Sequence, residues 1–599
     1  MSLFETTVKH KQFENKTLAL AYSELISMLK KAADIRHTPD GNLEIEFKIC
    51  LNQGFSVILD RNNLVFNGAG PTEILYAVYD LAEKVLGYCF FEPGTDICDP
   101  PEKIVLEQGY VIENTKPLLS NRGLIQEFAF SDGSYSLADW MAKNKLNYLL
   151  THMKYYDQLS NDLKEYFSVR GITIESGHHI FDYWIPAHKY YKKHPEYFAI
   201  INGERIVPYN DNGYLKGGQL CATDPGVRRE IAKNMIAYCK EHPEANIISL
   251  VPNDGFGWCE CEHCSKFYDK SRRGQLYCLS EHVYPAQELY HDMVRDVAAQ
   301  VRAVIPSKTV TFVAYVNYVE PSKNFILNNN MAVHVAPYWR CVNHRIYDRS
   351  CPINSMYIEA IQKWTKTKNG GHINIYEYYM GVNLYVSLPL VHHEDVFDEA
   401  AFYSQNGIDG LLTQFQMSHW TAYGLNYYCM AKALYGSGKE SVNSTLQKLF
   451  GPAFEDVGCF YSEMKKLVLS AGNCHITYPR ALFNRTQLAS YEYLHSCALA
   501  IAQKIPDNKF VQGFVIWTEY LLRFKNLFDL YHRKTQIDSE LRDFLDWARQ
   551  HKNDNVFVFE KLQMLIGKWQ ESIKSGRSWL HFNLDWEDEY IRKHDTLLR

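Results

Sequence analysis

Short apolar runs alternate with amphipathic, helix-like segments through the middle of the chain. Eight such runs end in turn residues and recur at the spacing of the strands in a (β/α)8 barrel. They are residues 122–127, 147–152, 171–176, 247–251, 310–316, 331–336, 373–378 and 410–415. This pattern predicts an α/β protein with a central (β/α)8 TIM barrel.

The pattern changes on both sides of these runs. Before them, residues 43–49 alternate apolar and charged side chains, and residues 54–68 are typical of a hairpin. After them the apolar periodicity is that of helices only. We therefore predict three domains: an N-terminal α/β domain (1–115), the catalytic barrel (116–431) and a C-terminal all-helical domain (432–599).

The fourth run ends in a carboxylate. Pro252 and Gly255 mark a turn out of the apolar run 247–251, and Asp254 lies in that turn. In a TIM barrel the chemistry lies where the strands end, and glycoside cleavage needs an acid and a second carboxylate. Asp254 is the candidate acid, although an Asp here can also cap a helix or turn. Glu377, late in the seventh run, is the candidate base or nucleophile, with a buried structural ion pair as the alternative.

Other polar and aromatic residues fall at or beyond the predicted strand ends. The candidates for binding sugar hydroxyls are Glu127, His152, His178 and His179. The candidate aromatic platforms for a sugar ring are Trp184, Trp339, Tyr379 and Trp420. Arg122 is a candidate hydrogen-bond donor to sugar hydroxyls or to a carboxylate. Each of the histidines and aromatic residues also has an ordinary interpretation, as a structural hydrogen-bonding group or as loop packing.

Composition and charge exclude some classes of binding partner. The formal net charge of −6 argues against nucleic acid, and no uncharged run approaches the length of a membrane span. Aromatic residues make up 14% of the chain; most must be core, but such an excess also suits a carbohydrate substrate. The first residues contain no apolar signal segment, so we expect a cytoplasmic location, or a secreted or periplasmic one if a leader precedes this sequence.

A cysteine cluster follows the candidate acid. Cys259, Cys261 and Cys264 have a spacing that can wrap one Zn²⁺, with Cys278 or His263 as the fourth ligand. Free buried thiols are the alternative. We expect any metal here to be structural and to stiffen the loop that carries Asp254, because the acid-base reaction itself requires no cofactor.

The order of several motifs resembles the family-20 β-N-acetylhexosaminidases. The motifs are Arg122-Gly123, Lys145-Leu146-Asn147, His152, Arg170-Gly171-Ile172 and Gly177-His178. In that family the fourth strand ends in an Asp-Glu pair, in which Glu is the acid and Asp orients the acetamido group of the substrate. The resemblance implies that Asp254 is the acid and that Asn253 contacts substrate. Asn253 lacks the charge that acetamido-assisted cleavage needs.

The segment from Gly68 to Phe91 looks like the domain that precedes the barrel in family-20 enzymes and in family-67 α-glucuronidases. Overall the chain resembles a bacterial glycoside-hydrolase-like family, domain of unknown function 4838, related to both, over residues 50–430. The motifs that carry this resemblance are His194-Pro195-Glu196-Tyr197-Phe198-Ala199, Gln219-Leu220-Cys221, Asn253-Asp254, Cys259, Cys261 and Cys264. It implies an O-glycoside hydrolase that removes a terminal hexosaminide or uronide in polysaccharide degradation. In the enzymes it resembles, a C-terminal helical domain often forms a dimer interface, so the resemblance is compatible with a homodimer as well as with a monomer.

Two other functions remain as alternatives. One is a non-catalytic carbohydrate-binding protein on a degenerate hydrolase barrel, which the Asn253 departure favours. The other is a zinc-dependent hydrolase that uses the cysteine cluster, against which three thiolates argue, because catalytic zinc usually keeps an open position with His or carboxylate ligands.

Overall fold

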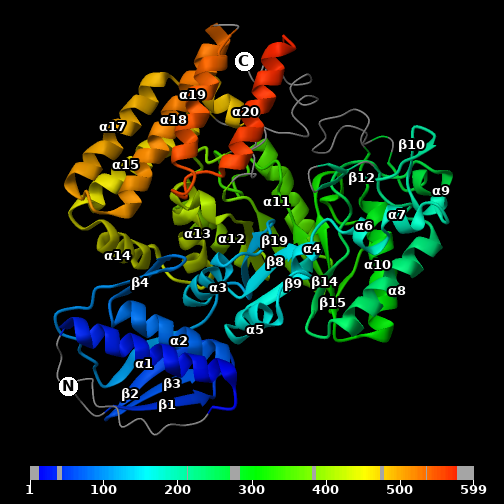
Figure 1. Ribbon diagram of the computed structural model, residues 1–599. Helices are drawn as coiled ribbons and strands as arrows, with labels where there is room; N and C mark the ends of the chain where they lie inside the picture. The colour runs from blue at the N-terminus through cyan, green and yellow to red at the C-terminus, as the bar shows by residue number, and fades with distance from the viewer. Residues whose placement is uncertain are drawn as a thin grey trace.

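The structure is a computed structural model, and it divides into three parts (Figure 1). It describes residues 13–36, 43–211, 214–216, 218–269, 271, 284–380, 386–471, 478–533, 536–576 and 580. An N-terminal sheet with two helices, a central barrel and a group of C-terminal helices follow one another along the chain. None of the helices in these residues is both long enough and apolar enough to cross a membrane.

Eight parallel strands close into a barrel, which confirms the fold predicted from the apolar runs. In spatial order the barrel reads β14-β15-β17-β19-β20-β7-β8-β9. Its strands are β7 (Asn121–Gln126), β8 (Tyr148–His152), β9 (Thr173–Gly177), β14 (Ile247–Ser249), β15 (Thr309–Ala314), β17 (Met331–Val335), β19 (His372–Glu377) and β20 (Gly410–Gln414). Each of the eight lies within or beside one of the predicted runs, and the fourth is the shortest.

Helices connect the strands and cover the barrel. The longer ones are α3 (Gly133–Lys143), α5 (Asn161–Val169), α8 (Pro225–Glu241), α10 (Gln287–Val304), α11 (Pro352–Thr365), α12 (Asp395–Gln405) and α13 (Trp420–Leu434). The start of α8 shows how local sequence sets these bounds. Asp224 accepts hydrogen bonds from the backbone N–H groups of Gly226 and Val227, and Pro225 occupies the first helical position, where its missing N–H costs nothing.

The connection between β9 and α8 is long and holds short elements. These are α6 (Phe181–Trp184), α7 (Ala187–Tyr190), η1 (Pro195–Tyr197) and the hairpins β10 (Ile200–Ile201) with β11 (Glu204–Arg205) and β12 (Tyr209–Asp211) with β13 (Tyr214–Lys216). Further short elements follow other strands: α4 (Met153–Tyr156), α9 (Glu262–Ser265), η3 (Val316–Tyr318), β16 (Leu327–Asn328), β18 (Lys368–Asn369) and η5 (Met417–His419).

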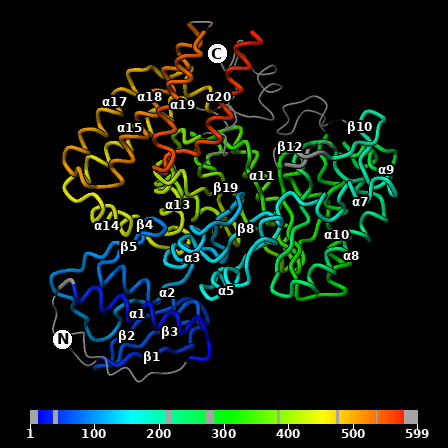
Figure 2. Tube along the Cα trace, in the orientation of Figure 1, coloured from blue at the N-terminus to red at the C-terminus, as the bar shows by residue number. Residues whose placement is uncertain are grey.

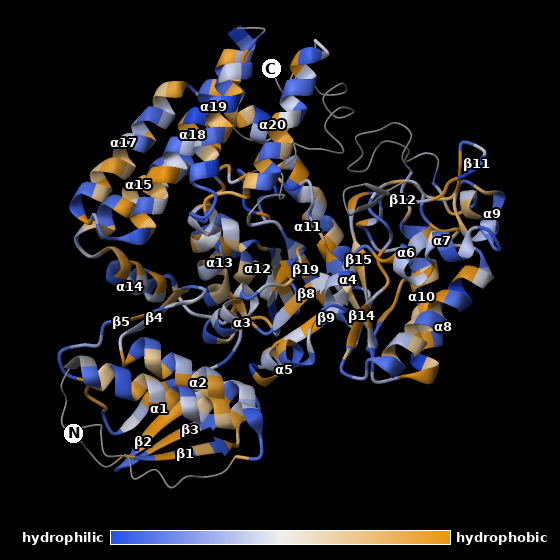
Figure 3. Ribbon diagram, in the orientation of Figure 1, coloured by the Kyte–Doolittle hydropathy of each residue, from blue (hydrophilic) through white to orange (hydrophobic). Residues whose placement is uncertain are grey.

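The N-terminal part has a core of its own. Its sheet has the order β1-β3-β2-β6, and Figure 3 shows apolar residues along β2 and β3 beneath the helices. The elements are α1 (Lys16–Arg36), β1 (Glu44–Ile49), β2 (Phe55–Asp60), β3 (Asn63–Gly68), α2 (Pro71–Lys84), β4 (Tyr88–Glu92), β5 (Thr95–Cys98) and β6 (Gly109–Thr115).

The C-terminal part is helical, as the periodicity predicts, and groups on one side of the barrel (Figure 2). Its elements are α14 (Lys439–Phe450), η6 (Gly451–Ala453), α15 (Phe454–Ala471), α16 (Tyr478–Arg485), α17 (Leu488–Lys504), α18 (Lys509–Arg533), α19 (Asp538–Gln550) and α20 (Phe559–Lys574). It shares one continuous apolar core with the barrel. The domain limits at 115 and 431 stay predictions.

A close approach between β9 and β14 fixes the part of the barrel that carries the candidate acid. Gly177 ends β9, and a Cβ atom at this position would overlap the side chain of Ser249 at the end of β14. Only glycine lets the two strands lie side by side at this level.

We therefore expect Gly177→Ala to destabilise the protein by about 3 kcal/mol, because the new Cβ atom would overlap Cβ and Oγ of Ser249, and the two strands must move apart to clear it. Urea unfolding followed by far-UV circular dichroism measures this. Gly458→Ala in α15 is the matched control: a Cβ atom there meets nothing within 4 Å, and alanine should leave stability equal or raise it by up to about 1 kcal/mol. Equal stabilities of the two variants would contradict the prediction.

Candidate active site at the C-terminal face of the barrel

Polar side chains from four strands, or from the loops directly after them, meet where the strands end. Glu127 follows β7, His178 and His179 follow β9, Asp254 follows β14, and Tyr376 lies in β19. Parallel strands of a closed barrel end at one common face, so residues far apart in the sequence come together there.

Glu127 lies at the centre of one hydrogen-bonded group. Its Oε1 atom accepts hydrogen bonds from the Tyr376 hydroxyl at 2.9 Å and from Nε2 of Gln414 at 2.7 Å. Nε2 of His178 lies 3.0 Å from the Tyr376 oxygen and 3.5 Å from the same Glu127 atom. The carboxylate is thus oriented by side chains of β19, of β20 and of the loop after β9.

His178 is held in a costly conformation. Its φ of 71° lies in the left-handed region, which side chains with a Cβ rarely adopt and which is concentrated at functional sites. Burial is the main cause that places the pKa of His178 well below its usual range, with smaller contributions from the neighbouring imidazoles of His152 and His179. Burial also lowers the pKa of His152 to about 3. Both rings are therefore neutral at physiological pH and serve as hydrogen-bonding groups.

Asp254 faces the second histidine. Nδ1 of His179 donates to the carbonyl of Pro252 at 2.6 Å, so the other ring nitrogen, Nε2, points to Asp254, whose Oδ1 lies 3.7 Å away. That buried oxygen has no hydrogen-bond partner among the described residues. With Nδ1 committed to the Pro252 carbonyl, Nε2 is the ring nitrogen of His179 that faces the Asp254 carboxyl group.

Several tyrosine rings lie near this carboxyl group. Burial raises the pKa values of Tyr315, Tyr318 and Tyr378, and the negative charge of Asp254 adds to each of these shifts. The ring of Tyr338 joins Tyr315 to Tyr378, with centroid separations of 5.2 and 5.4 Å. The side chain of Asp254 itself is 24% exposed, so the carboxyl group lies at the edge of this group of rings and remains open on one side.

The structure corrects the expectation that Asn253 contacts substrate. Its side chain is buried: Oδ1 accepts from the backbone N–H of Asp182 at 3.2 Å, and Nδ2 donates to the carbonyl of Gly218 at 3.5 Å. The backbone of Asn253 is held by both ends of the Gln219 amide. An aspartate could not donate to the Gly218 carbonyl, which explains in structural terms why an amide stands here.

Glu377 lies on the other side of its strand. Successive side chains of a strand point to opposite faces, so with Tyr376 directed to the barrel axis, Glu377 is directed to the covering helices. It is 0% exposed, and its Oε1 accepts from Arg340 at 2.5 Å and from the Tyr403 hydroxyl at 2.9 Å. Arg340 also binds Glu399. These contacts correct the assignment of Glu377 as base or nucleophile and favour the structural ion pair.

Four further expectations are corrected for similar reasons. Arg122 lies at the N-terminal end of β7, far from the strand ends, where it donates to backbone carbonyls and stacks on Tyr435. The three aromatic residues that prove to be core packing rather than platforms are Trp184, Tyr379 and Trp420, at most 4% exposed. Trp339 is 5% exposed and meets the ring of Tyr338 edge to face, and its role as a platform stays a prediction.

The sequence did not indicate one cation that lies near this face. Lys561 comes from α20, and its Nζ lies 5.2 Å from the ring centroid of Phe128, the residue after Glu127. Burial lowers the pKa of Lys561, and the charge of Glu127 opposes this shift in part. Among the described residues, no carboxylate forms a salt bridge with it. No local pattern in a helix more than 400 residues away could have indicated this position.

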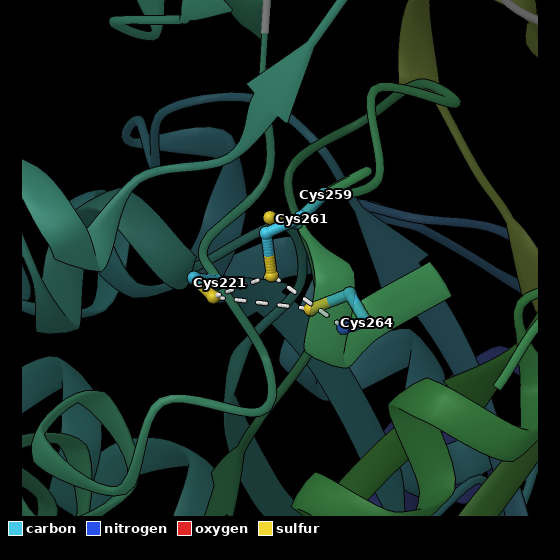
Figure 4. Close-up of side chains that lie close together, drawn as sticks. All are labelled: Cys221, Cys259, Cys261 and Cys264. Carbon is cyan, nitrogen blue, oxygen red and sulfur yellow. Dashed lines mark hydrogen bonds between the residues drawn. The ribbon is translucent and has the colours of Figure 1, made fainter. Parts of the chain in front are cut away.

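The structure also identifies a fourth cysteine. Cys221 lies beside Cys259, Cys261 and Cys264, and their four sulfur atoms are all within 4.8 Å of one another (Figure 4). Cys278 lies outside the described residues, and His263 is exposed and not part of the group. A second group that could hold a metal consists of Cys341, His344 and Cys351, with an exposed histidine.

Residues 112–454 match the model of one protein family, described as Domain of unknown function (DUF4838). The chain belongs to this family. A search of curated proteins finds no match. The matched segment contains all eight strands of the barrel, and both Asp254 and Glu127 lie within it.

Two solved structures illustrate what the chain is similar to. A GH138 enzyme that targets pectin rhamnogalacturonan II is 10% identical and has a TM-score of 0.46, over 96% of this chain and 81% of that one. The β-N-acetylhexosaminidase of Bacteroides fragilis is 12% identical with a TM-score of 0.46, over 76% of this chain and 92% of that one. At these low identities and TM-scores, neither likeness bears on the reaction or the substrate.

We expect Glu377→Gln to lower the free energy of unfolding by about 1–3 kcal/mol, because it weakens a buried, charge-assisted hydrogen-bond group. Its kcat/KM should stay within about threefold of the wild type, because the residue does not face the reaction site. Urea unfolding and steady-state kinetics on the same preparation separate the two effects. A folded variant that loses most of its turnover would restore a catalytic role for Glu377.

Proposed function

We propose that the protein is a glycoside hydrolase that removes a terminal sugar, with Asp254 as the general acid. The observation that carries this proposal is the Asp254–His179 pair. A carboxyl oxygen that is buried without a hydrogen-bond partner is costly, and such groups are concentrated at functional sites. Its place, beyond the fourth strand and among tyrosine rings, is where a leaving-group oxygen can receive a proton.

His179 supports the acid by fixing where the proton lies. The Pro252 carbonyl holds the proton of Nδ1, so Nε2 faces Asp254 in every cycle of the reaction. After Asp254 gives its proton to the departing oxygen, the ring nitrogen that faces it takes a proton from water and passes that proton to the Asp254 carboxylate. This arrangement returns the acid to its starting state without movement of the backbone.

Glu127 is the second carboxylate of the site in this proposal. It lies at the same face, and the Tyr376 hydroxyl and the Gln414 amide both donate to it. Donors of this kind stabilise the charged form of a carboxylate. Glu127 therefore acts as the negative group that the oxocarbenium-like transition state requires, as base or as nucleophile, while Asp254 supplies the proton.

Two observations favour a uronide over an N-acetylhexosaminide as the substrate. Asn253, at the position of the acetamido-orienting residue in family-20 enzymes, is committed to the backbone of the neighbouring loop. Lys561 places a cation beside Glu127, without a salt bridge to any described carboxylate. The charge of Glu127 offsets the burial of this cation only in part, and the carboxylate of a uronic acid adds a counter-charge where a neutral sugar does not.

We expect Asp254→Asn to lower kcat/KM on 4-nitrophenyl glycosides by roughly 10²–10⁴-fold, the usual contribution of a general acid. The loss should be much smaller on 2,4-dinitrophenyl glycosides of the same sugar, because that leaving group departs without a proton. The panel covers glucuronides, N-acetylhexosaminides and neutral hexosides, with the exposed Asp162→Asn as control.

An equal loss on both leaving groups would contradict the acid role of Asp254. Sugar binding without turnover on any member of the panel, unchanged by Asp254→Asn, would contradict the enzyme proposal itself and favour a carbohydrate-binding protein.

We expect Lys561→Met to lower kcat/KM on glucuronides by about 10–100-fold, mostly through KM, because a charge-assisted hydrogen bond contributes about 1.5–3 kcal/mol. On a neutral hexoside the change should be small. Lys574→Met, at the exposed end of the same helix, is the matched control and should change neither. Equal effects of Lys561→Met on charged and neutral sugars would overturn the uronide assignment and leave the acid role of Asp254 intact.

A further inference from the structure

We propose that Cys221, Cys259, Cys261 and Cys264 together bind one zinc ion, and that this ion clamps the loop that presents Asp254. The proposal goes beyond the hydrolase function and does not depend on it. The four cysteines come from two segments separated by α8 and β14. Three of them share a short motif in the sequence, whereas Cys221 joins them only through the fold (Figure 4).

The separations between the sulfur atoms fit a single, tetrahedrally coordinated metal ion. The Sγ atom of Cys221 lies 3.8 Å from that of Cys261 and 3.8 Å from that of Cys264. Four sulfurs at the Zn–S distance of about 2.3 Å form a tetrahedron whose edges are about 3.8 Å. A disulfide would bring one pair to about 2.05 Å, which these distances exclude for both pairs. An iron–sulfur cluster, with several metal atoms inside its cysteines, needs a wider cage.

Hydrogen-bond donors lie around the sulfur atoms. The backbone N–H of Ile200 donates to Cys259 at 3.4 Å, and that of Cys264 donates to Cys261 at 3.5 Å. The hydroxyl of Thr223 lies 3.1 Å from the sulfur of Cys264. Donors directed at the ligand atoms are the usual outer shell of a metal site, and they spread the negative charge that four thiolates bring to it.

The chemistry of the donor set selects the ion. Thiolates prefer soft or borderline metals, which argues against magnesium and calcium, and four sulfurs with tetrahedral spacing indicate zinc. A set of four protein ligands leaves no open position for water or substrate. The ion proposed here is therefore structural, and it takes no step in the hydrolysis.

The position of the site shows what the ion would stabilise. Cys221 follows Gln219, whose side-chain amide binds both the N–H and the carbonyl of Asn253. Cys259 follows Gly257, whose carbonyl accepts from the N–H of Gln219 at 2.8 Å. The segment with Asp254 thus runs between two anchored ends, and joining those ends through one ion limits how far Asp254 can move from His179.

The experiment is a metal analysis of the full-length protein, produced with zinc supplied in the medium and purified without chelators. Inductively coupled plasma mass spectrometry should find one zinc per chain in the wild type. Cys221→Ser should lose it, whereas Cys341→Ser, in the second cysteine–histidine group, should keep it. These three results together support the site.

A second measurement keeps the proposal testable if Cys221→Ser does not fold. Wild-type protein refilled with Co²⁺ should show the intense thiolate charge-transfer bands and the visible bands of a tetrahedral four-sulfur site. Loss of zinc in Cys341→Ser, a metal-free wild type, or a cobalt spectrum of octahedral oxygen and nitrogen ligands would each overturn the assignment. All of these readouts are independent of turnover, so a failed hydrolase proposal would leave them unaffected.

Discussion

One buried negative charge organises the centre of the barrel. Glu175 of β9 is 0% exposed. It accepts hydrogen bonds from the Tyr148 hydroxyl of β8 at 2.7 Å and from the Ser249 hydroxyl of β14 at 2.9 Å. It also forms an ion pair with Nε2 of His334 in β17, at 2.7 Å. Burial raises its pKa, but the charge and hydrogen bond of His334, together with the hydrogen bonds of Thr311 and Tyr148, outweigh burial and leave the pKa lowered. A carboxylate in this position is tolerable only when all of these strands keep their register, so it constrains where each strand ends.

The same constraint fixes the positions of residues at the C-terminal face of the barrel. With β9 and β14 locked together at Glu175 and Ser249, the next residues along the two strands emerge side by side, which places His179 opposite Asp254. The alternation of side chains then decides the remaining roles. In β19 it sends Tyr376 towards Glu127 and its neighbour Glu377 towards Arg340, so two adjacent residues belong to different environments.

The sequence predicted the barrel and the position of Asp254, because apolar runs and strand ends are local signals. The same two-residue period separates Tyr376 from Glu377, but a carboxylate within an apolar strand is compatible with catalysis as well as with a buried ion pair. Arg122 belongs to the opposite face, because the start of a strand lies at the other end of the barrel from its end. The buried tryptophans could not be told from platforms, since ring type does not reveal exposure. Cys221 and Lys561 depend on long-range packing, for which the sequence carries no periodic signal.

In the proposed enzyme, the position of Lys561 separates the residues of the reaction from the residue that selects the sugar. Asp254, His179 and Glu127 all lie within residues 112–454, the part that matches the family, whereas α20 lies outside it. The barrel and the C-terminal helices share one apolar core, and Trp517 of α18 donates to the carbonyl of Ser387 at 2.8 Å. A rigid contact of this kind lets a helix outside the barrel hold a charge beside the site. In the proposed enzyme, a change in α20 would alter which sugar is recognised while Asp254 and its proton transfer stay as they are.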